Sequence, residues 1–187
     1  MSNDFEEKLK EGNVWEELLK EKLAKVLFTE SVKRIEYSDG EYEAELQKTG
    51  IDGIINRKVV TFDVKARKHW CYKHNDILIE TVSVVENDIL GWFYTSKADF
   101  VAYVWENEDR TDLIDGYLIF IQDIDLKVWF EVHHERFIEK EAESNNHQWH
   151  TLNRVVPIDE FPDGTILQFN PTINLQSQKI DLLEHLK

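Results

Sequence analysis

The chain has 187 residues, the size of a single domain, and 42% of them are hydrophobic. That share is enough for a packed core and excludes a disordered or low-complexity chain. Acidic residues outnumber basic ones by 37 to 22, which gives a net charge of −15. A charge of this sign disfavours nucleic-acid binding over most of the surface.

Residue patterns exclude several further classes. The apolar runs are strand-sized and far short of the ~20 residues that a membrane helix needs. The first residues do not follow the basic, apolar and small-residue order of a secretory signal. The single cysteine, Cys71, excludes a disulfide framework and a cysteine-based zinc cluster. We therefore expect a cytoplasmic protein with no membrane partner.

The N-terminal part has a helical pattern, and two predicted hairpins follow it. Residues 3–6 have the spacing of a capping box, which predicts the start of a helix that Gly12 interrupts or ends. Trp15, Leu19 and Leu23 then recur at helical spacing, which predicts an amphipathic helix over residues 13–28. The first hairpin joins strands at 32–37 and 42–47 through Asp39-Gly40. The second joins strands at 51–55 and 59–65 through residues 56–58.

The rest of the chain alternates between strand and helix patterns. Apolar runs predict strands at 77–85, 100–105, 117–122 and 151–158. Helical spacing predicts helices over 124–138 and 180–186, and the polar residues 139–147 predict a loop. This order favours one domain of the α+β or mixed α/β class over residues 1–187, with a core at about 12–122 and a C-terminal extension at 123–187.

The sharpest chemical feature is a set of charged residues in the second predicted hairpin. Asp63 and Lys65 alternate along one strand, so they fall on the same face, and Asp52 lies near the start of the neighbouring strand. Mg²⁺ prefers a few carboxylate oxygens together with water molecules. A lysine beside such a site can orient the attacking water or stabilise developing negative charge. The alternative is a purely structural role, in which these residues form a cross-strand ion pair in a surface hairpin.

The strand context distinguishes this pattern from two others like it. The chain also contains Glu6-Glu7-Lys8 and Asp125-Leu126-Lys127. Both lie in predicted helices, where residues two apart do not share a face. Only the pair of Asp63 and Lys65 stands on a predicted strand with an aspartate on the strand before it.

Asp52 followed by Asp63-Val64-Lys65 resembles the core motif of the PD-(D/E)XK nuclease superfamily. The resemblance covers about residues 12–105 and implies a restriction-endonuclease-like mixed β-sheet flanked by helices, with an α-β-β-β-α-β core. In the Holliday-junction-resolvase branch a glutamate of the first helix joins the site, and Gly12 and Glu16 have that spacing. One departure is Ile51, which stands where the superfamily usually has proline.

The resemblance implies an enzyme, its cofactor and its partners. The implied activity is a Mg²⁺-dependent endonuclease, with Mn²⁺ as a possible substitute, that cuts DNA and leaves a 5′-phosphate. Asp52, Asp63 and Glu16 would bind the metal, and Lys65 would position the water. Because two strands are cut, a homodimer is expected. No glycine-rich phosphate loop occurs, so a nucleotide cofactor is not expected.

Several candidate residues keep two interpretations. Glu80 is a lone acid in an apolar strand, either an extra member of the site or an outward-facing residue. Glu16 is either a ligand or one of several acids on the polar face of its helix. Lys97, in Ser-Lys-Ala-Asp, either contacts phosphate or belongs to a structural turn.

Charge distribution adds a candidate binding segment and two competing functions. Residues 56–74 carry six basic side chains and one acidic one, while the rest of the chain has a net charge of −20. If this segment binds DNA, the residues expected to contact phosphate are Arg57, Lys58, Arg67 and Lys68. The alternative is a solvated loop that neutralises nearby acidic residues. The acidic remainder also suits a catalytically inactive nuclease-fold module that binds or regulates a protein, or an acidic DNA mimic.

Overall fold

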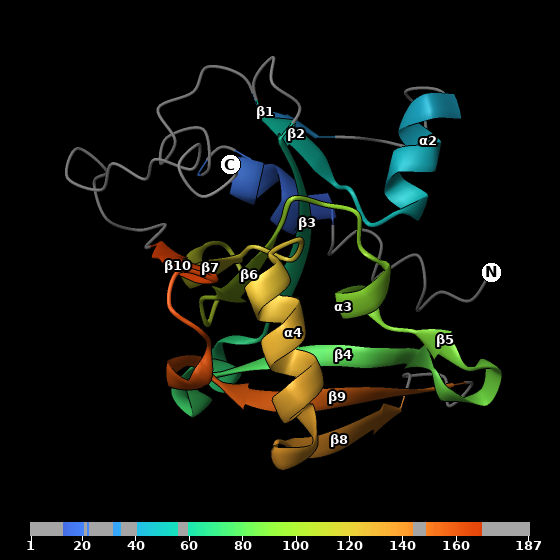
Figure 1. Ribbon diagram of the computed structural model, residues 1–187. Coiled ribbons are helices and arrows are strands. Elements are labelled where there is room, and N and C mark those ends of the chain that lie inside the picture. Colours follow the sequence, from blue (N-terminus) through green and yellow to red (C-terminus); the bar gives the residue numbers. More distant parts are fainter. Residues whose placement is uncertain are drawn as a thin grey trace.

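The computed structural model of the chain describes residues 13–20, 22, 32–34, 41–55, 60–143 and 149–169. These residues form two β-sheets accompanied by a few helices (Figure 1). Most strand pairs are antiparallel, so the expected α+β class is confirmed at that level. None of the helices among the described residues is long and apolar enough to cross a bilayer.

The first sheet has six strands in the order β1-β2-β3-β6-β7-β10. Their bounds are β1 Val32–Arg34, β2 Gly53–Ile55, β3 Val60–Arg67, β6 Phe100–Glu106, β7 Leu113–Ile119 and β10 Ile166–Phe169. β2 and β3 pair antiparallel, as the second predicted hairpin requires, whereas β3 and β6 pair parallel. All seven residues of β6 are buried, which places this strand at the centre of the molecule.

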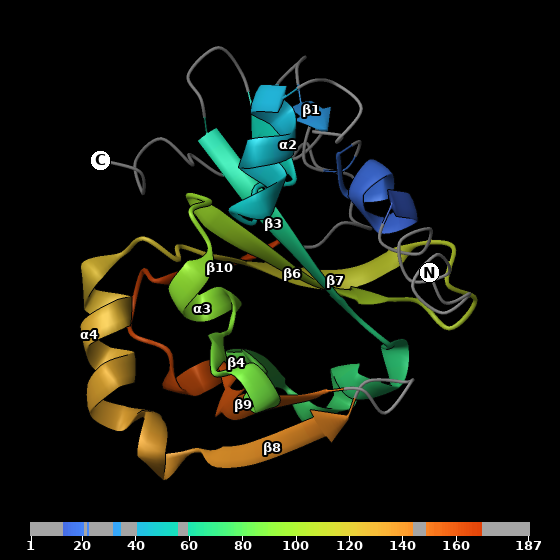
Figure 2. The same ribbon diagram turned by 90° about the vertical axis from the view of Figure 1, so that its right-hand side faces the viewer.

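The second sheet has four strands in the order β5-β4-β9-β8. Their bounds are β4 Asp76–Val84, β5 Ile89–Leu90, β8 Ile138–Glu143 and β9 His150–Pro157. A 3-10 helix, His69–His74, connects β3 of the first sheet to β4 of the second. Helices α3 (Trp92–Thr95) and α4 (Ile124–His133) lie beside the two sheets (Figure 2).

The two faces of β3 contribute to different environments. Phe62 and Val64 pack on one face into a cluster with Trp15 and Leu19 of the helical residues 13–20. The opposite face of the first sheet belongs to a second cluster, which includes Val101 and Tyr103 of β6, Ile77 and Ile79 of β4, and Phe130 of α4. Asp63 and Lys65 pair with Val101 and Tyr103, so they share the face that meets the second sheet.

The predicted strand at residues 42–47 is wrong, because Glu41–Lys48 form helix α2. The segment is rich in Glu, Ala, Leu, Gln and Lys, which are strong helix formers. A Glu45–Lys48 ion pair one turn apart supports the helix, and Leu46 packs against the buried Ile51 and Ala98. The apolar residues at every second position fitted a strand equally well, but backbone propensity and packing favour the helix.

Three boundaries in the second half also differ from the predictions. The strand predicted at 117–122 is β7, which begins at Leu113 and ends at Ile119. The chain then turns, and Asp123 caps α4 by accepting hydrogen bonds from the backbone N–H groups of Asp125 and Leu126. The helix predicted to reach residue 138 ends at His133.

Residues 139–147 are not wholly a loop, because Ile138–Glu143 form edge strand β8. All six of its residues are exposed, and a strand without a buried face has no hydrophobic alternation to reveal it. Glu139 lies opposite Arg154 of β9, and their side chains form an ion pair of 2.7 Å.

Several predictions concern segments that lie outside the described residues. These are the capping box at 3–6, the end of the first helix at 23–28, the Asp39-Gly40 turn, the turn at 56–58 and the helix at 180–186. The strands predicted at 77–85, 100–105 and 151–158 lie within the described residues and correspond to β4, β6 and β9. Within the C-terminal extension, β8 and β9 belong to the second sheet and β10 to the first.

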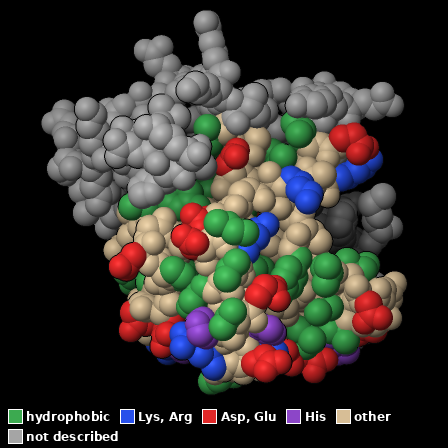
Figure 3. Space-filling view, viewed as in Figure 1, with side chains coloured by type: hydrophobic (Ala, Val, Ile, Leu, Met, Phe, Trp, Pro, Cys, Tyr) green, Lys and Arg blue, Asp and Glu red, His purple; other side chains and the backbone are tan. Residues whose placement is uncertain are grey.

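The surface near α4 combines acidic and apolar side chains (Figure 3). Ile124, Val128 and Val132 of this helix are each more than half exposed. They recur every four residues, so they form one apolar stripe along the helix.

Candidate active site

Strands β2 and β3 bring Asp52 and Asp63 opposite each other. Gly53 pairs with Phe62, so the next residues on either strand are Asp52 and Asp63. The backbone N–H of Asp52 donates to the carbonyl of Phe62 at 2.7 Å, and the Asp52 carboxylate accepts from the backbone N–H of Val64 at 2.8 Å. These two bonds fix the Asp52 side chain against β3.

Asp63 is a buried carboxylate with only part of its hydrogen-bonding capacity used. Its side chain is 3% exposed, and its Oδ1 accepts a hydrogen bond of 2.9 Å from Lys65 Nζ. Its Oδ2 is buried, and no N–H or O–H group of the described residues is placed to donate a hydrogen bond to it. A buried, unpartnered carboxylate oxygen is costly, and it is also the kind of atom that binds a hard cation.

Gly50 leaves the room that this oxygen occupies. A Cβ at Gly50 would lie 3.6 Å from Asp63 Oδ2 and 3.3 Å from Ser96 Oγ, and the φ of +74° is one that other residues rarely adopt. The loop before β2 can therefore pass close to the carboxylate because position 50 is glycine.

The side chain of Asp52 keeps its proton to a much higher pH than an ordinary aspartate does. Burial, the negative charges of Asp63 and Glu16, and a side-chain hydrogen bond with Asp63 together raise the pKa of Asp52 to about 8, although the charge of Lys65 acts in the opposite direction. At neutral pH without a metal, Asp52 is therefore mostly protonated. A cation between the two aspartates would displace that proton.

Lys65 keeps its positive charge despite its surroundings. Burial lowers the pKa of Lys65, but the carboxylates of Asp63, Asp52 and Glu80 outweigh burial and leave the pKa above its usual value. A third of the side chain is exposed. The ammonium therefore stays charged at neutral pH and reaches solvent beside the Asp63 carboxylate, where it is suited to stabilising negative charge.

Glu80 joins the site from the second sheet. It lies on β4, is half-buried, and accepts a hydrogen bond of 3.4 Å from the backbone N–H of Trp92. Burial raises the pKa of Glu80, and Lys65 is close enough to lower it in opposition. The adjacent Gly91 packs directly on this residue, because a Cβ there would lie 2.2 Å from the Glu80 carbonyl oxygen.

Glu16 approaches from the helical residues 13–20. Its charge contributes to the raised pKa of Asp52, so the side chain lies within electrostatic range of the aspartate. The five residues predicted as the catalytic set are thus coupled electrostatically through Asp52 and Lys65. They come from a helix, two strands of one sheet and one strand of the other.

The Ser-Lys-Ala-Asp segment is a structural connection that holds β3 in place. The Asp99 carboxylate accepts hydrogen bonds from the backbone N–H of Thr61 at 2.6 Å and from its hydroxyl at 2.8 Å. The backbone N–H of Lys97 donates to the carbonyl of Thr49 at 2.9 Å, and the Lys97 side chain is exposed. This segment therefore ties the start of β3 to the loop before Asp52.

The basic residues predicted to contact phosphate lie in different settings. Arg67 is largely buried in an ion pair of 2.6 Å with Asp76, which joins β3 to β4. Lys68 is half-exposed and lies 3.8 Å from Glu106. Arg57 and Lys58 lie outside the described residues. Lys68, and Lys97 near the site, are the described candidates whose side chains reach solvent.

The donor set fits a hard divalent cation that keeps much of its water. No three His, Cys, Asp or Glu side chains within the described ranges converge into a complete metal-binding group. Mg²⁺ does not need such a group, because it is commonly held by one or two carboxylates and completes its shell with water. Asp63 Oδ2 and the Asp52 carboxylate are the atoms that could hold it.

Comparison of the chain with protein-family models and with curated proteins finds no match to either.

Proposed function

We propose that the protein is a Mg²⁺-dependent endonuclease of the PD-(D/E)XK type that hydrolyses phosphodiester bonds in DNA. The observation that carries the proposal is the meeting of Asp52, Asp63 and Lys65 at one end of the β2–β3 pair. Glu80 and Glu16 lie within electrostatic range of this group. A surface hairpin with a simple ion pair would not explain a buried Asp63 or a protonated Asp52.

Each residue has a chemical role in the proposed reaction. Asp63 and Asp52 would hold the metal, and Glu16 would complete its shell directly or through water. The bound metal would acidify a coordinated water and neutralise charge on the phosphate. Lys65 would orient the attacking water and stabilise the negative charge that develops on the phosphoryl oxygens. Water adds to phosphorus and the bond to the 3′-oxygen breaks, which leaves a 5′-phosphate and a 3′-hydroxyl.

The order of elements supports a restriction-endonuclease-like core. A helix at residues 13–20 is followed by β1, β2 and β3, then by α3 and by β6, which runs parallel to β3. When α2, which follows β1, and β4 and β5, which follow β3, are treated as additions, the remaining order is α-β-β-β-α-β, the order that the resemblance to the superfamily implies. A homodimer belongs to the proposal because two strands must be cut.

One observation favours a second candidate, a nuclease-fold module that binds a partner without catalysis. Outside residues 56–74 the net charge is −20, and such a surface would repel a duplex away from the site. The module does not require Asp52 and Asp63 to bind a metal, so metal binding separates the two candidates. A DNA mimic would need neither the metal nor Lys65.

The test is nicking of supercoiled plasmid with Mg²⁺ or Mn²⁺ by purified wild type and by Lys65→Ala. The matched control is Lys127→Ala, because Asp125-Leu126-Lys127 has the same acid-x-Lys sequence on helix α4. We expect a loss of activity of at least about a hundredfold for Lys65→Ala and none for Lys127→Ala.

Equal cleavage by wild type and Lys65→Ala would overturn the nuclease assignment. Absence of cleavage by wild type, together with absence of Asp52-dependent metal binding, would favour the binding module. Circular dichroism of both variants shows whether a loss of activity reflects chemistry or misfolding.

A further inference from the structure

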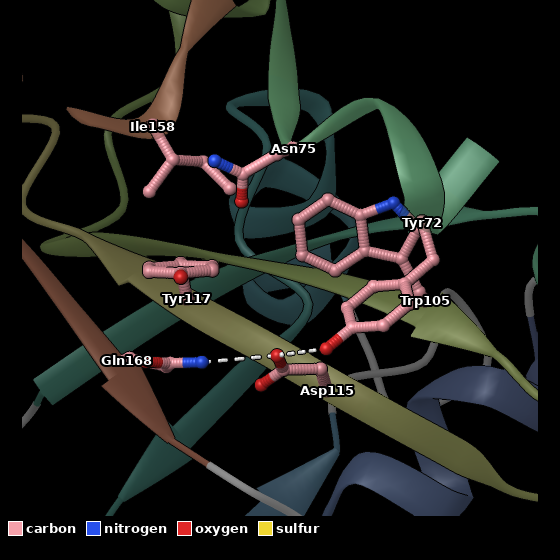
Figure 4. Close-up of a pocket in the computed structure, with 7 residues that line it drawn as sticks. All are labelled: Tyr72, Asn75, Trp105, Asp115, Tyr117, Ile158 and Gln168. Atoms are coloured by element: carbon pink, nitrogen blue, oxygen red, sulfur yellow. Dashed lines mark hydrogen bonds between the residues drawn. The ribbon is translucent and has the colours of Figure 1, made fainter. Parts of the chain in front are cut away.

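A cavity of about 240 Å³ opens between the two sheets beyond β7, and none of the five proposed catalytic residues lines it. Tyr72, Trp105 and Tyr117 are the aromatic residues of its lining, and Asp115 lies between Tyr72 and Gln168, with Asn75 on the opposite side (Figure 4). Pockets for drug-sized ligands usually exceed about 300 Å³, so this cavity suits a smaller group.

The three rings stand at steep angles to one another instead of in parallel. The ring centroids of Tyr72 and Trp105 are 5.8 Å apart at 67°, and those of Trp105 and Tyr117 are 6.0 Å apart at 83°. Tyr72 and Tyr117 are partly exposed, whereas the Trp105 side chain is fully buried. An accessible tyrosine ring beside a carboxylate is an arrangement that binds organic cations.

Asp115 adds a buried negative charge to this aromatic enclosure. The residue is 4% exposed, and its partners in the part of the chain that the structure describes are neutral. The Tyr72 hydroxyl and the Gln168 amide donate to Oδ2, each at 3.0 Å, and the backbone N–H of Gly116 donates to Oδ1 at 2.8 Å. A buried carboxylate without a cationic partner is costly, and a bound cation would offset that cost.

The hydrogen bonds also indicate which cation fits. A carboxylate accepts about four hydrogen bonds, and three of those positions are already used. A ligand would therefore gain from its charge and from apolar contact with the rings more than from its own N–H donors. The geometry points to a binding site for a methylated ammonium group, carried by a small molecule or by a methylated lysine side chain.

The site is independent of the proposed nuclease chemistry, so each can fail without the other. Trp105 pairs with Arg67 across β3 and β6, one alternation beyond the pair of Lys65 and Tyr103. A substitution at Asp63 removes a proposed metal ligand and leaves every cavity residue in place. Asp63→Asn should therefore bind the ammonium ligand as wild type does.

The experiment is isothermal titration of the full chain with choline and with its neutral carbon isostere, 3,3-dimethyl-1-butanol. Choline should bind at least about tenfold more tightly than the isostere, because only choline gains from the carboxylate and the π-faces. Asp115→Asn should remove that preference, and Tyr72→Leu should weaken choline binding severalfold. Trp70→Leu is the matched control, since Trp70 is 58% exposed in the same 3-10 helix but does not line the cavity.

A short peptide carrying trimethyllysine distinguishes the two sources of the ligand. Tighter binding of the peptide than of choline indicates a protein partner, and equal binding indicates a small molecule; both outcomes support the site. Equal affinity for choline and the isostere, or no saturation by any ammonium probe up to about 10 mM, would overturn it. Tyr72 is half-exposed, so Tyr72→Leu keeps the test valid if Asp115→Asn does not fold.

Discussion

Replacing Asp52 with asparagine should stabilise the metal-free protein while removing a proposed metal ligand. The pKa of Asp52 lies near 8 in the folded protein because burial and neighbouring negative charges disfavour ionisation, against 3.8 as the ordinary value. A raised acid pKa means that the folded state binds a proton that the unfolded state has released. The stabilising contribution is therefore complete below pH 3.8 and is lost as pH rises towards 8.

The size of the effect follows from that difference. Each unit between the two pKa values corresponds to about 1.36 kcal/mol, so at pH 7 wild type loses up to about 4 kcal/mol relative to low pH. Asparagine has no proton to release, and its side-chain oxygen can still accept from the Val64 N–H. Because Asp52 is not fully buried, we expect a gain of about 2–4 kcal/mol, or roughly 5–15 °C in Tm.

The assay is thermal and urea unfolding of both proteins in EDTA at pH 5, 6, 7 and 8. The gain of Asp52→Asn should grow with pH across this range and shrink when Mg²⁺ is added, because the metal stabilises only wild type. The exposed Asp109→Asn should show neither trend. A variant that is less stable than wild type by the same amount at every pH would refute the reasoning.

Three further predictions concern the supports of the site and its lysine. Gly91→Ala should lower the free energy of unfolding by at least about 2–3 kcal/mol, because the added Cβ would lie 2.2 Å from the Glu80 carbonyl oxygen. Gly164→Ala has open space around its Cβ but a φ of +80°, and should lower it by about 1–2 kcal/mol. Urea unfolding measures both changes. Asp99→Ala should cost about 1–3 kcal/mol by leaving the Thr61 N–H without its acceptor, and Asp99→Asn should recover most of the loss; equal losses would contradict that cause. Between pH 6 and about pH 10, Lys65 should stay charged, because its neighbouring carboxylates hold its pKa above the usual value, so its deprotonation should not lower the cleavage rate. A decrease in rate near neutral pH that Lys65→Arg abolishes would contradict this charge state.

The site was predictable where local sequence alone fixes geometry. Alternation places Asp63 and Lys65 on one face of β3, and a short hairpin places Asp52 beside them. Those two facts need only strand period and chain connectivity. Glu80 is different, because its position depends on how β4 of the second sheet meets β3, and no local pattern determines that contact.

The incorrect fold predictions also arise where packing and long-range pairing decide the structure. The segment Glu41–Lys48 carries apolar residues at every second position and strong helix formers at once, so periodicity and propensity disagreed. Strand β8 is held by pairing with β9 and by the Glu139–Arg154 ion pair, both of which are long-range in sequence. The cavity around Asp115 depends on β6, β7, β10 and a 3-10 helix together, so only the folded chain reveals it.

The central claim is that Asp52 and Asp63 together bind a divalent metal beside Lys65. The most direct measurement is the anomalous difference density of crystals soaked in Mn²⁺. We predict a peak within coordination distance of Asp63 Oδ2 and the Asp52 carboxylate, about 2.0–2.2 Å from each, and its loss in Asp63→Asn. A peak at other residues would contradict the account. So would crystals soaked in saturating Mn²⁺ that show no density between the two aspartates and no change in the positions of their side chains.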